Sequence, residues 1–130
     1  MEKIRRSPES FSVRKRAQSF RHATRGIAIF LKGTHNAWIQ LCILFIAVAA
    51  GFYFQITHTD WLLLVLSGGL VLMAEAFNTA IEVDIDLTSP EYHPYARDTK
   101  DIAAGGVLIA SITALIVGIV IFGPYIAVLF

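Results

Sequence analysis

Glu75, Asn78 and Glu82 stand in a stretch that is otherwise apolar enough to cross a membrane. At 100° per residue along a helix, the two glutamates fall about 20° apart and the asparagine about 60° to one side, so the three share a face. An ionisable side chain at the centre of a bilayer costs about 2.5–3.5 kcal/mol on insertion scales. These side chains must therefore face a protein interior or a wet cleft, and they are the first candidates for a functional site.

Further polar residues extend this group. Asp86 falls on the same face if the helix continues, and Lys100 and Asp101 follow a short loop. Carboxylate and amide oxygens suit Mg²⁺, and a lysine suits a phosphoryl group as a point charge. A carboxylate deeper in the membrane could accept a proton from an alcohol whose tail stays in lipid. The set predicts phosphoryl transfer, although the sequence has neither a Walker-type loop nor a kinase-type glycine loop.

Two other interpretations remain open. Glu75 and Glu82 could pair with Arg97, Lys100 or another helix as buried polar contacts without a catalytic role. Intramembrane carboxylates also carry protons or ions in pumps and channels. The alternative function is therefore a non-catalytic or ion- or proton-handling small membrane protein. Several acidic residues lie beside a polar loop that is followed by Lys100-Asp101. This arrangement favours phosphoryl transfer over both of these alternatives.

The elements that must position these residues are membrane spans. Of the 130 residues, 55% are hydrophobic, and a span needs about 20 residues. Three stretches qualify, at about 37–56, 61–83 and 102–130. We expect one all-α integral membrane domain over residues 1–130. Ser89-Pro90 should end the second helix, Asp98 or Thr99 should cap the third, and the third span could tilt or end at Gly123-Pro124.

The charge distribution predicts the orientation. Nine of the eleven Lys and Arg residues precede His35, and the link 57–60 has none, so the positive-inside rule places the N-terminus and the 84–101 loop in the cytoplasm. Residues 10–32 alternate apolar and basic side chains at helical spacing, which predicts an amphipathic helix on the membrane surface. Residues 1–9 are polar and are expected to be disordered.

Three segments resemble the signature of the prokaryotic diacylglycerol kinase family, which includes undecaprenol kinases. They are Glu75-Ala-Phe-Asn-Thr-Ala-Ile-Glu82, Pro90-Glu-Tyr-His93 and Lys100-Asp-Ile-Ala-Ala104, and the likeness covers roughly residues 10–125. Such proteins are homotrimers of three spans plus an amphipathic helix, with active sites between subunits. The resemblance implies a bacterial cytoplasmic membrane enzyme that transfers the γ-phosphate of ATP, with Mg²⁺, to the hydroxyl of diacylglycerol or undecaprenol. The loop 88–94 is closer to undecaprenol kinases, and no nucleic-acid partner is expected.

The resemblance also implies roles for single residues. Glu75 would be the general base, Asn78 would support the site, and Glu82 would bind both Mg²⁺ and nucleotide. The other nucleotide contacts would be Glu91, Tyr92, His93, Lys100 and Asp101, with Lys15 and His22 on the surface helix.

One position departs from the family pattern. Thr34 stands where the family usually has a second metal-binding glutamate, and an uncharged hydroxyl is a poorer Mg²⁺ ligand. Either metal binding is weaker, or Asp86, Asp101 or His35 compensates, or catalysis has been lost. We expect an active enzyme, because every other motif residue is present. We also expect a homo-oligomer, because one three-span chain should not hide Glu75 and Glu82 from lipid, and the small residues of 103–110 invite a neighbouring helix.

Overall fold

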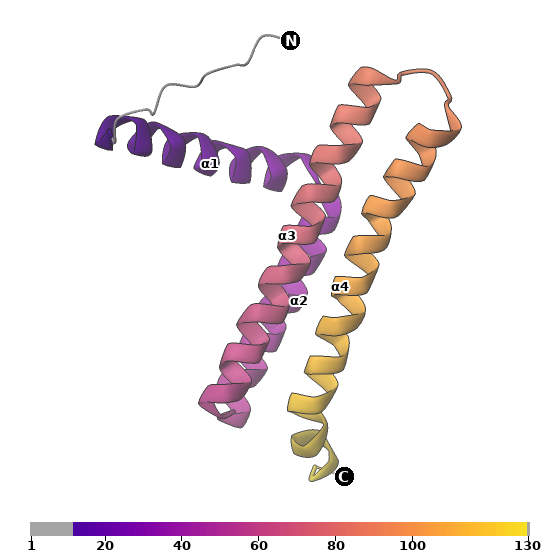
Figure 1. The fold of residues 1–130 in the computed structure, drawn as a ribbon. Helices are drawn as coiled ribbons and strands as arrows, with labels where there is room; N and C mark the ends of the chain where they lie inside the picture. Colours follow the sequence, from indigo (N-terminus) through magenta and orange to yellow (C-terminus); the bar gives the residue numbers. More distant parts are fainter. Residues whose placement is uncertain (1–11, 130) are drawn as a thin grey trace.

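The computed structural model describes residues 12–129, which form four α-helices and no strand. The helices are α1 (Val13–Gly33), α2 (His35–Phe54), α3 (His58–Thr88) and α4 (Pro94–Ala127). Figure 1 shows α2, α3 and α4 running alongside one another, with α1 projecting to one side from the start of α2 at a steep angle. The three long helices are each apolar enough to cross a membrane, which confirms the all-α membrane fold. The disorder expected for residues 1–9 lies outside the described residues.

A single residue makes the corner between α1 and α2. Thr34 has extended backbone angles (φ −116°, ψ 110°) and ends one helix while beginning the next. The indole N–H of Trp38 donates to the Leu31 carbonyl at 2.7 Å, which ties the first turn of α2 to the last turn of α1. Large apolar side chains on α1, such as Phe20 and Ile27, are exposed, as expected for a helix that lies on a membrane surface.

The turn between α2 and α3 brings these two helices together in antiparallel fashion. Gln55 ends α2 in the left-handed region (φ 51°). Thr57 and Asp60 then form a capping box at the start of α3, in which each residue's side chain accepts from the other's backbone N–H, at 3.2 and 3.1 Å. Such reciprocal bonds satisfy backbone donors that the first turn of a helix otherwise leaves unpaired.

Both α3 and α4 are longer than the predicted spans. At 1.5 Å per residue, the 31 residues of α3 extend about 46 Å, whereas the hydrocarbon core of a bilayer is about 30 Å thick. As predicted, α3 ends directly before Ser89-Pro90. Its excess length, together with that of α4, projects beyond α1 in Figure 1 and carries the polar residues of the candidate site.

The prediction for the start of the last helix was wrong. Neither Asp98 nor Thr99 caps it, because α4 already begins at Pro94, with His93 as the N-cap. Proline suits the first helical position, where its missing N–H has no intrahelical partner to lose. Lys100 and Asp101 therefore lie in the second turn of a helix rather than at its end. At the other end, α4 continues through Pro124 to Ala127.

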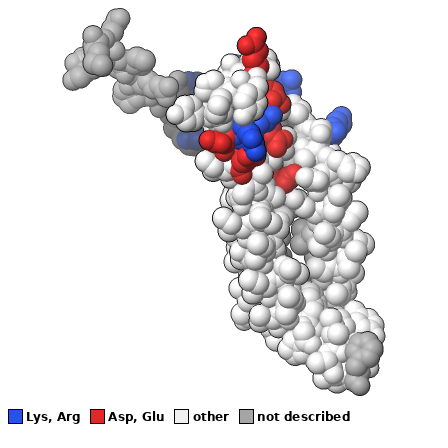
Figure 2. All heavy atoms as spheres, turned by 90° about the vertical axis from the view of Figure 1, so that its right-hand side faces the viewer, with Lys and Arg blue, Asp and Glu red and all other residues white. Residues whose placement is uncertain are grey.

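The middle helix, α3, packs against both α2 and α4. A cavity of about 640 Å³ lies between the three helices and is lined almost entirely by apolar residues, with Gln40 among the few polar ones. Charged side chains gather at the end of the molecule where α3 meets α4, and the lower part of the face shown in Figure 2 carries none. The fold thus presents a charged end above a long apolar body.

Candidate active site

Two polar residues of the predicted stripe are buried on α3. Glu75 is 2% exposed and Asn78 is 8% exposed. The expectation that one chain cannot cover Glu75 is therefore wrong, because α2 and α4 pack on either side of α3 and cover it without a second subunit. Glu82, two turns nearer the charged end, is half-buried.

The hydrogen-bond partner of Glu75 comes from α2. The Gln40 amide nitrogen donates to Glu75 Oε2 at 3.2 Å, and the Gln40 oxygen Oε1 is buried without a partner among the described residues. Gln40 was not among the predicted site residues. Its signal was present, since an amide between Ile39 and Leu41 in an apolar span needs a polar partner.

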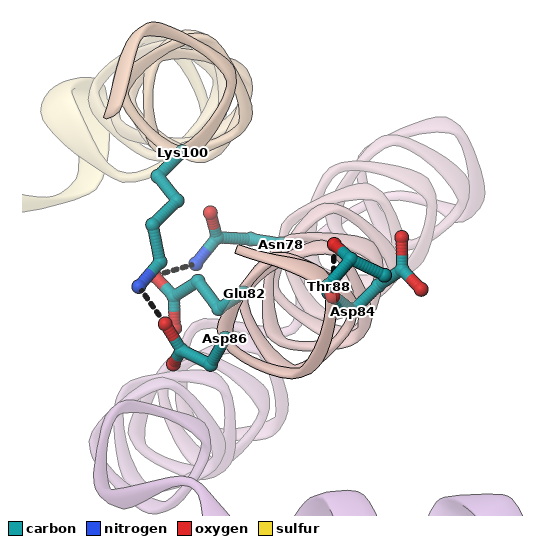
Figure 3. Close-up of polar contacts among 6 residues, drawn as sticks. All are labelled: Asn78, Glu82, Asp84, Asp86, Thr88 and Lys100. Atoms are coloured by element: carbon teal, nitrogen blue, oxygen red, sulfur yellow. Dashed lines mark hydrogen bonds and ion pairs between the residues drawn. The ribbon is translucent and has the colours of Figure 1, made fainter. Parts of the chain in front are cut away.

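Toward the charged end, three side chains of α3 turn toward α4. Asn78, Glu82 and Asp86 lie on the side of α3 nearest Lys100 in Figure 3, which confirms their predicted common face. The Asn78 amide nitrogen donates to Glu82 Oε1 at 3.0 Å, and Lys100 Nζ donates to Asp86 Oδ1 at 2.6 Å. The Asn78 oxygen Oδ1 is buried and has no partner in the described part of the chain. Asp84 points away, on the opposite side of α3.

Lys100 supplies the positive charge of this cluster. It lies before the third apolar span, and its hydrogen bond to Asp86 raises its pKa above the ordinary value of 10.5, with the charge of Glu82 acting in the same direction. The ammonium group therefore stays protonated throughout the neutral range. A permanent cation of this kind is suited to bind a phosphate group.

Other predicted nucleotide contacts lie apart from the cluster within this chain. Asp101 pairs with Arg97 one turn before it on α4, at 3.6 Å. Glu91 and Tyr92 are exposed in the loop between α3 and α4, and the His93 ring accepts the Tyr95 backbone N–H at 3.3 Å, as the cap of α4. Lys15 and His22 are exposed on α1.

Thr34 lies beside the cluster. Its hydroxyl is 3.2 Å from the hydroxyl of Thr79 on α3. Glu82 follows Thr79 by three residues, and residues three apart are neighbours on a helix surface. The corner between α1 and α2 therefore places residue 34 against α3 one turn before Glu82. In this chain the side chain of residue 34 offers only a hydroxyl.

The donor set decides what kind of metal site is possible. Across residues 12–129, no group of three or more His, Cys, Asp or Glu residues is arranged to hold a metal ion. The half-buried Glu82 carboxylate is nevertheless an oxygen donor of the kind that Mg²⁺ takes, and the Asn78 amide nitrogen donates to it. One such carboxylate fits Mg²⁺, which usually takes one or two protein ligands and completes its shell with water and substrate phosphates.

With this geometry in place, comparison with known proteins is decisive. The sequence model of the family described as prokaryotic diacylglycerol kinase matches residues 21–122. The chain belongs to the prokaryotic diacylglycerol kinase family. As a member of this family, it is a lipid kinase, and its three long apolar helices make it a membrane protein.

Individual relatives carry both of the family's acceptor names. Undecaprenol kinase of Bacillus subtilis is 33% identical over 82% of this chain and 87% of its own length. Diacylglycerol kinase of Synechocystis is 36% identical over 77% of this chain and 58% of its own. Diacylglycerol kinase of Helicobacter pylori is 30% identical over 92% of this chain and 96% of its own. These names support a kinase and give no support to an ion-handling protein.

Proposed function

We propose that this lipid kinase transfers the γ-phosphoryl group of ATP to the hydroxyl of a lipid alcohol, at the cytoplasmic surface of a bacterial inner membrane. The observation that carries the proposal is the order of the polar residues along α3, from the apolar body of the molecule toward its charged end. Glu75 is buried beside apolar helices, while Glu82 and Asp86, with Lys100 bound to Asp86, form the charged end two to three turns beyond it. An alcohol reaching Glu75 from lipid would meet the end of a nucleotide whose phosphates extend from Lys100 past Glu82.

Glu75 is the proposed general base. It would take the proton of the lipid hydroxyl while the hydroxyl oxygen forms a bond to the γ-phosphorus. The bond from that phosphorus to the bridging oxygen breaks, and ADP leaves with the electron pair. Because Glu75 is only 2% exposed, little water can compete with the alcohol for the phosphoryl group.

Glu82 is the proposed Mg²⁺ ligand, with water and the nucleotide phosphates completing the shell, and Asn78 supports the site through its hydrogen bond to Glu82. Bound there, Mg²⁺ would neutralise charge that develops on the phosphates during transfer. Lys100, which Asp86 holds at the rim of the site, would bind a phosphate oxygen. Thr34 supplies at most a hydroxyl to the metal.

The remaining nucleotide contacts belong to the same proposal. The loop between α3 and α4 lies at the charged end (Figure 1), within reach of a nucleotide held by Lys100. A nucleotide lying across this end would find further polar side chains on the loop, on α4 and on α1. These are Glu91, Tyr92, His93, Asp101, Lys15 and His22.

Assembly as a homotrimer, with the N-terminus in the cytoplasm, is also part of the proposal. A methyl group added at Gly105 or Gly106 would meet no atom within 4 Å, so packing within one chain does not account for these small residues on α4. Small residues let another helix approach closely. The basic residues at and before α1 support the orientation.

The acceptor can be decided directly. Purified protein in nanodiscs would receive labelled ATP with diacylglycerol or undecaprenol, side by side. We expect phosphorylated lipid, with undecaprenol as the better acceptor, because the loop 88–94 resembles that of undecaprenol kinases. Faster transfer to diacylglycerol would reverse the choice of acceptor. No labelled product from either lipid would overturn the proposed function.

A further inference from the structure

The Gln40 side chain joins the buried carboxylate to the cavity between the helices. Its amide nitrogen donates to Glu75, and the residue also lines the cavity between α2, α3 and α4. Its oxygen Oε1 is buried and has no hydrogen-bond partner among the described residues. A buried amide oxygen without a partner is unfavourable and rare, so its presence calls for a physical explanation.

An amide can bind a carboxyl group in either protonation state. The nitrogen of glutamine is a donor and suits an ionised carboxylate, whereas the oxygen is an acceptor and suits a protonated carboxyl group. A half-turn about the last side-chain bond exchanges the two atoms, and rotation about this bond is nearly two-fold. Gln40 therefore has the right acceptor ready for Glu75 at the moment when Glu75 gains a proton.

We propose that Gln40 is a positioning residue that holds Glu75 in one orientation before and after proton transfer. In the resting site, Gln40 Nε2 donates to the ionised Glu75. When the alcohol proton has moved to Glu75, the new carboxyl O–H donates to Gln40 Oε1, and the amide turns back when the proton leaves. The unpartnered oxygen is then the acceptor reserved for the second state. This inference rests on the proposed role of Glu75 as the base.

Kinetics of Gln40 variants provide one test. Gln40→Met keeps the length of the side chain and removes both hydrogen-bonding atoms. We expect kcat to fall by as much as about 10²-fold, the loss typical of a misplaced reacting group, with KM for ATP unchanged. Cys42→Ala, an exposed position on the same helix, is the matched control and should retain the wild-type rate. A wild-type kcat for Gln40→Met would overturn the proposal.

The pH profile tests the contact between Gln40 and Glu75. Gln40→Glu keeps the size of the side chain and places a second carboxylate beside Glu75. Two adjacent carboxylates share a proton that one alone would release, so the acid limb of the pH–rate profile should move to higher pH. An acid limb at its wild-type position would contradict the contact between residue 40 and Glu75, and with it the proposal.

Infrared difference spectra give a readout that needs no turnover. Acidification should produce a protonated carboxyl band that is missing from Glu75→Gln, and this band should move to higher frequency in Gln40→Met as its hydrogen bond is lost. An unmoved band would overturn the role of Gln40, even in an active kinase. A shifted band in a protein that phosphorylates neither lipid would overturn the proposed function and leave the pairing of Gln40 with Glu75 established.

Discussion

Two adjacent glycines on α3 allow the packing that positions the site to be measured. Gly68 faces α2 so closely that an added methyl group would lie 2.6 Å from Leu44 Cδ1, whereas a methyl group at Gly69 would meet nothing within 4 Å. Gly68 lies two turns before Glu75, and Leu44 lies one turn after Gln40. This contact therefore fixes the spacing of α2 and α3 at the level just below the site.

The two alanine variants are expected to differ in stability. Both should gain about 0.8–1 kcal/mol, because alanine favours a helix interior over glycine. Gly68→Ala must also displace Leu44, and overpacking of this kind costs about 1–3 kcal/mol. Since the clash falls on the end of a flexible side chain, we expect the lower half of that range. Gly69→Ala should thus be stabilised, and Gly68→Ala should be about 1–2 kcal/mol less stable than Gly69→Ala.

Reversible unfolding of both variants in mixed micelles measures this difference, and transfer rates measured on the same samples link it to function. Widening the gap between α2 and α3 should lengthen the hydrogen bond from Gln40 to Glu75 and slow transfer in Gly68→Ala alone. Equal stability of the two variants would refute the close approach of α2 to α3. A slowed Gly69→Ala would refute its link to the site.

The other substitutions test the charged end. Glu82→Gln should raise KM for Mg·ATP, because one carboxylate ligand is lost; an unchanged KM in steady-state assays would remove Glu82 from the metal site. Thr34→Glu should lower the Mg²⁺ concentration for half-maximal activity, since a carboxylate would extend toward Glu82; no change, or lost activity, would show that another group already fills that position. Asp86→Asn should lower KM for ATP by releasing Lys100 to bind phosphate, and a raised KM would mean that Asp86 itself contacts the metal or nucleotide.

The membrane fold and the common face of the acidic residues were predictable from sequence for simple physical reasons. Runs of apolar residues long enough for a bilayer define the three long helices, and basic residues interleaved with apolar ones define α1. The helical period placed Asn78, Glu82 and Asp86 on one face, and the structure confirms it. These features depend on local composition and spacing, which a single sequence contains.

Features set by packing between helices were not predictable in the same way. The burial of Glu75 depends on how closely α2 and α4 approach α3, and no local pattern encodes that distance. Gln40 was missed because its partner lies on another helix, although a lone amide in an apolar span was a visible sign. The start of α4 at Pro94 was missed because the cap was expected at Asp98 or Thr99, whereas Pro94 already occupies the first helical position.

The central claim is that Glu75 is the base of a lipid kinase, and Glu75→Gln tests it most directly. The substitution keeps the size of the side chain and a hydrogen bond to Gln40 while removing the ability to take a proton. Transfer of labelled phosphate to the lipid and binding of Mg·ATP would be measured on the same preparation. We predict that transfer falls by about 10²–10⁴-fold while binding stays at the wild-type level. Retained transfer, or loss of Mg·ATP binding together with transfer, would contradict the assignment.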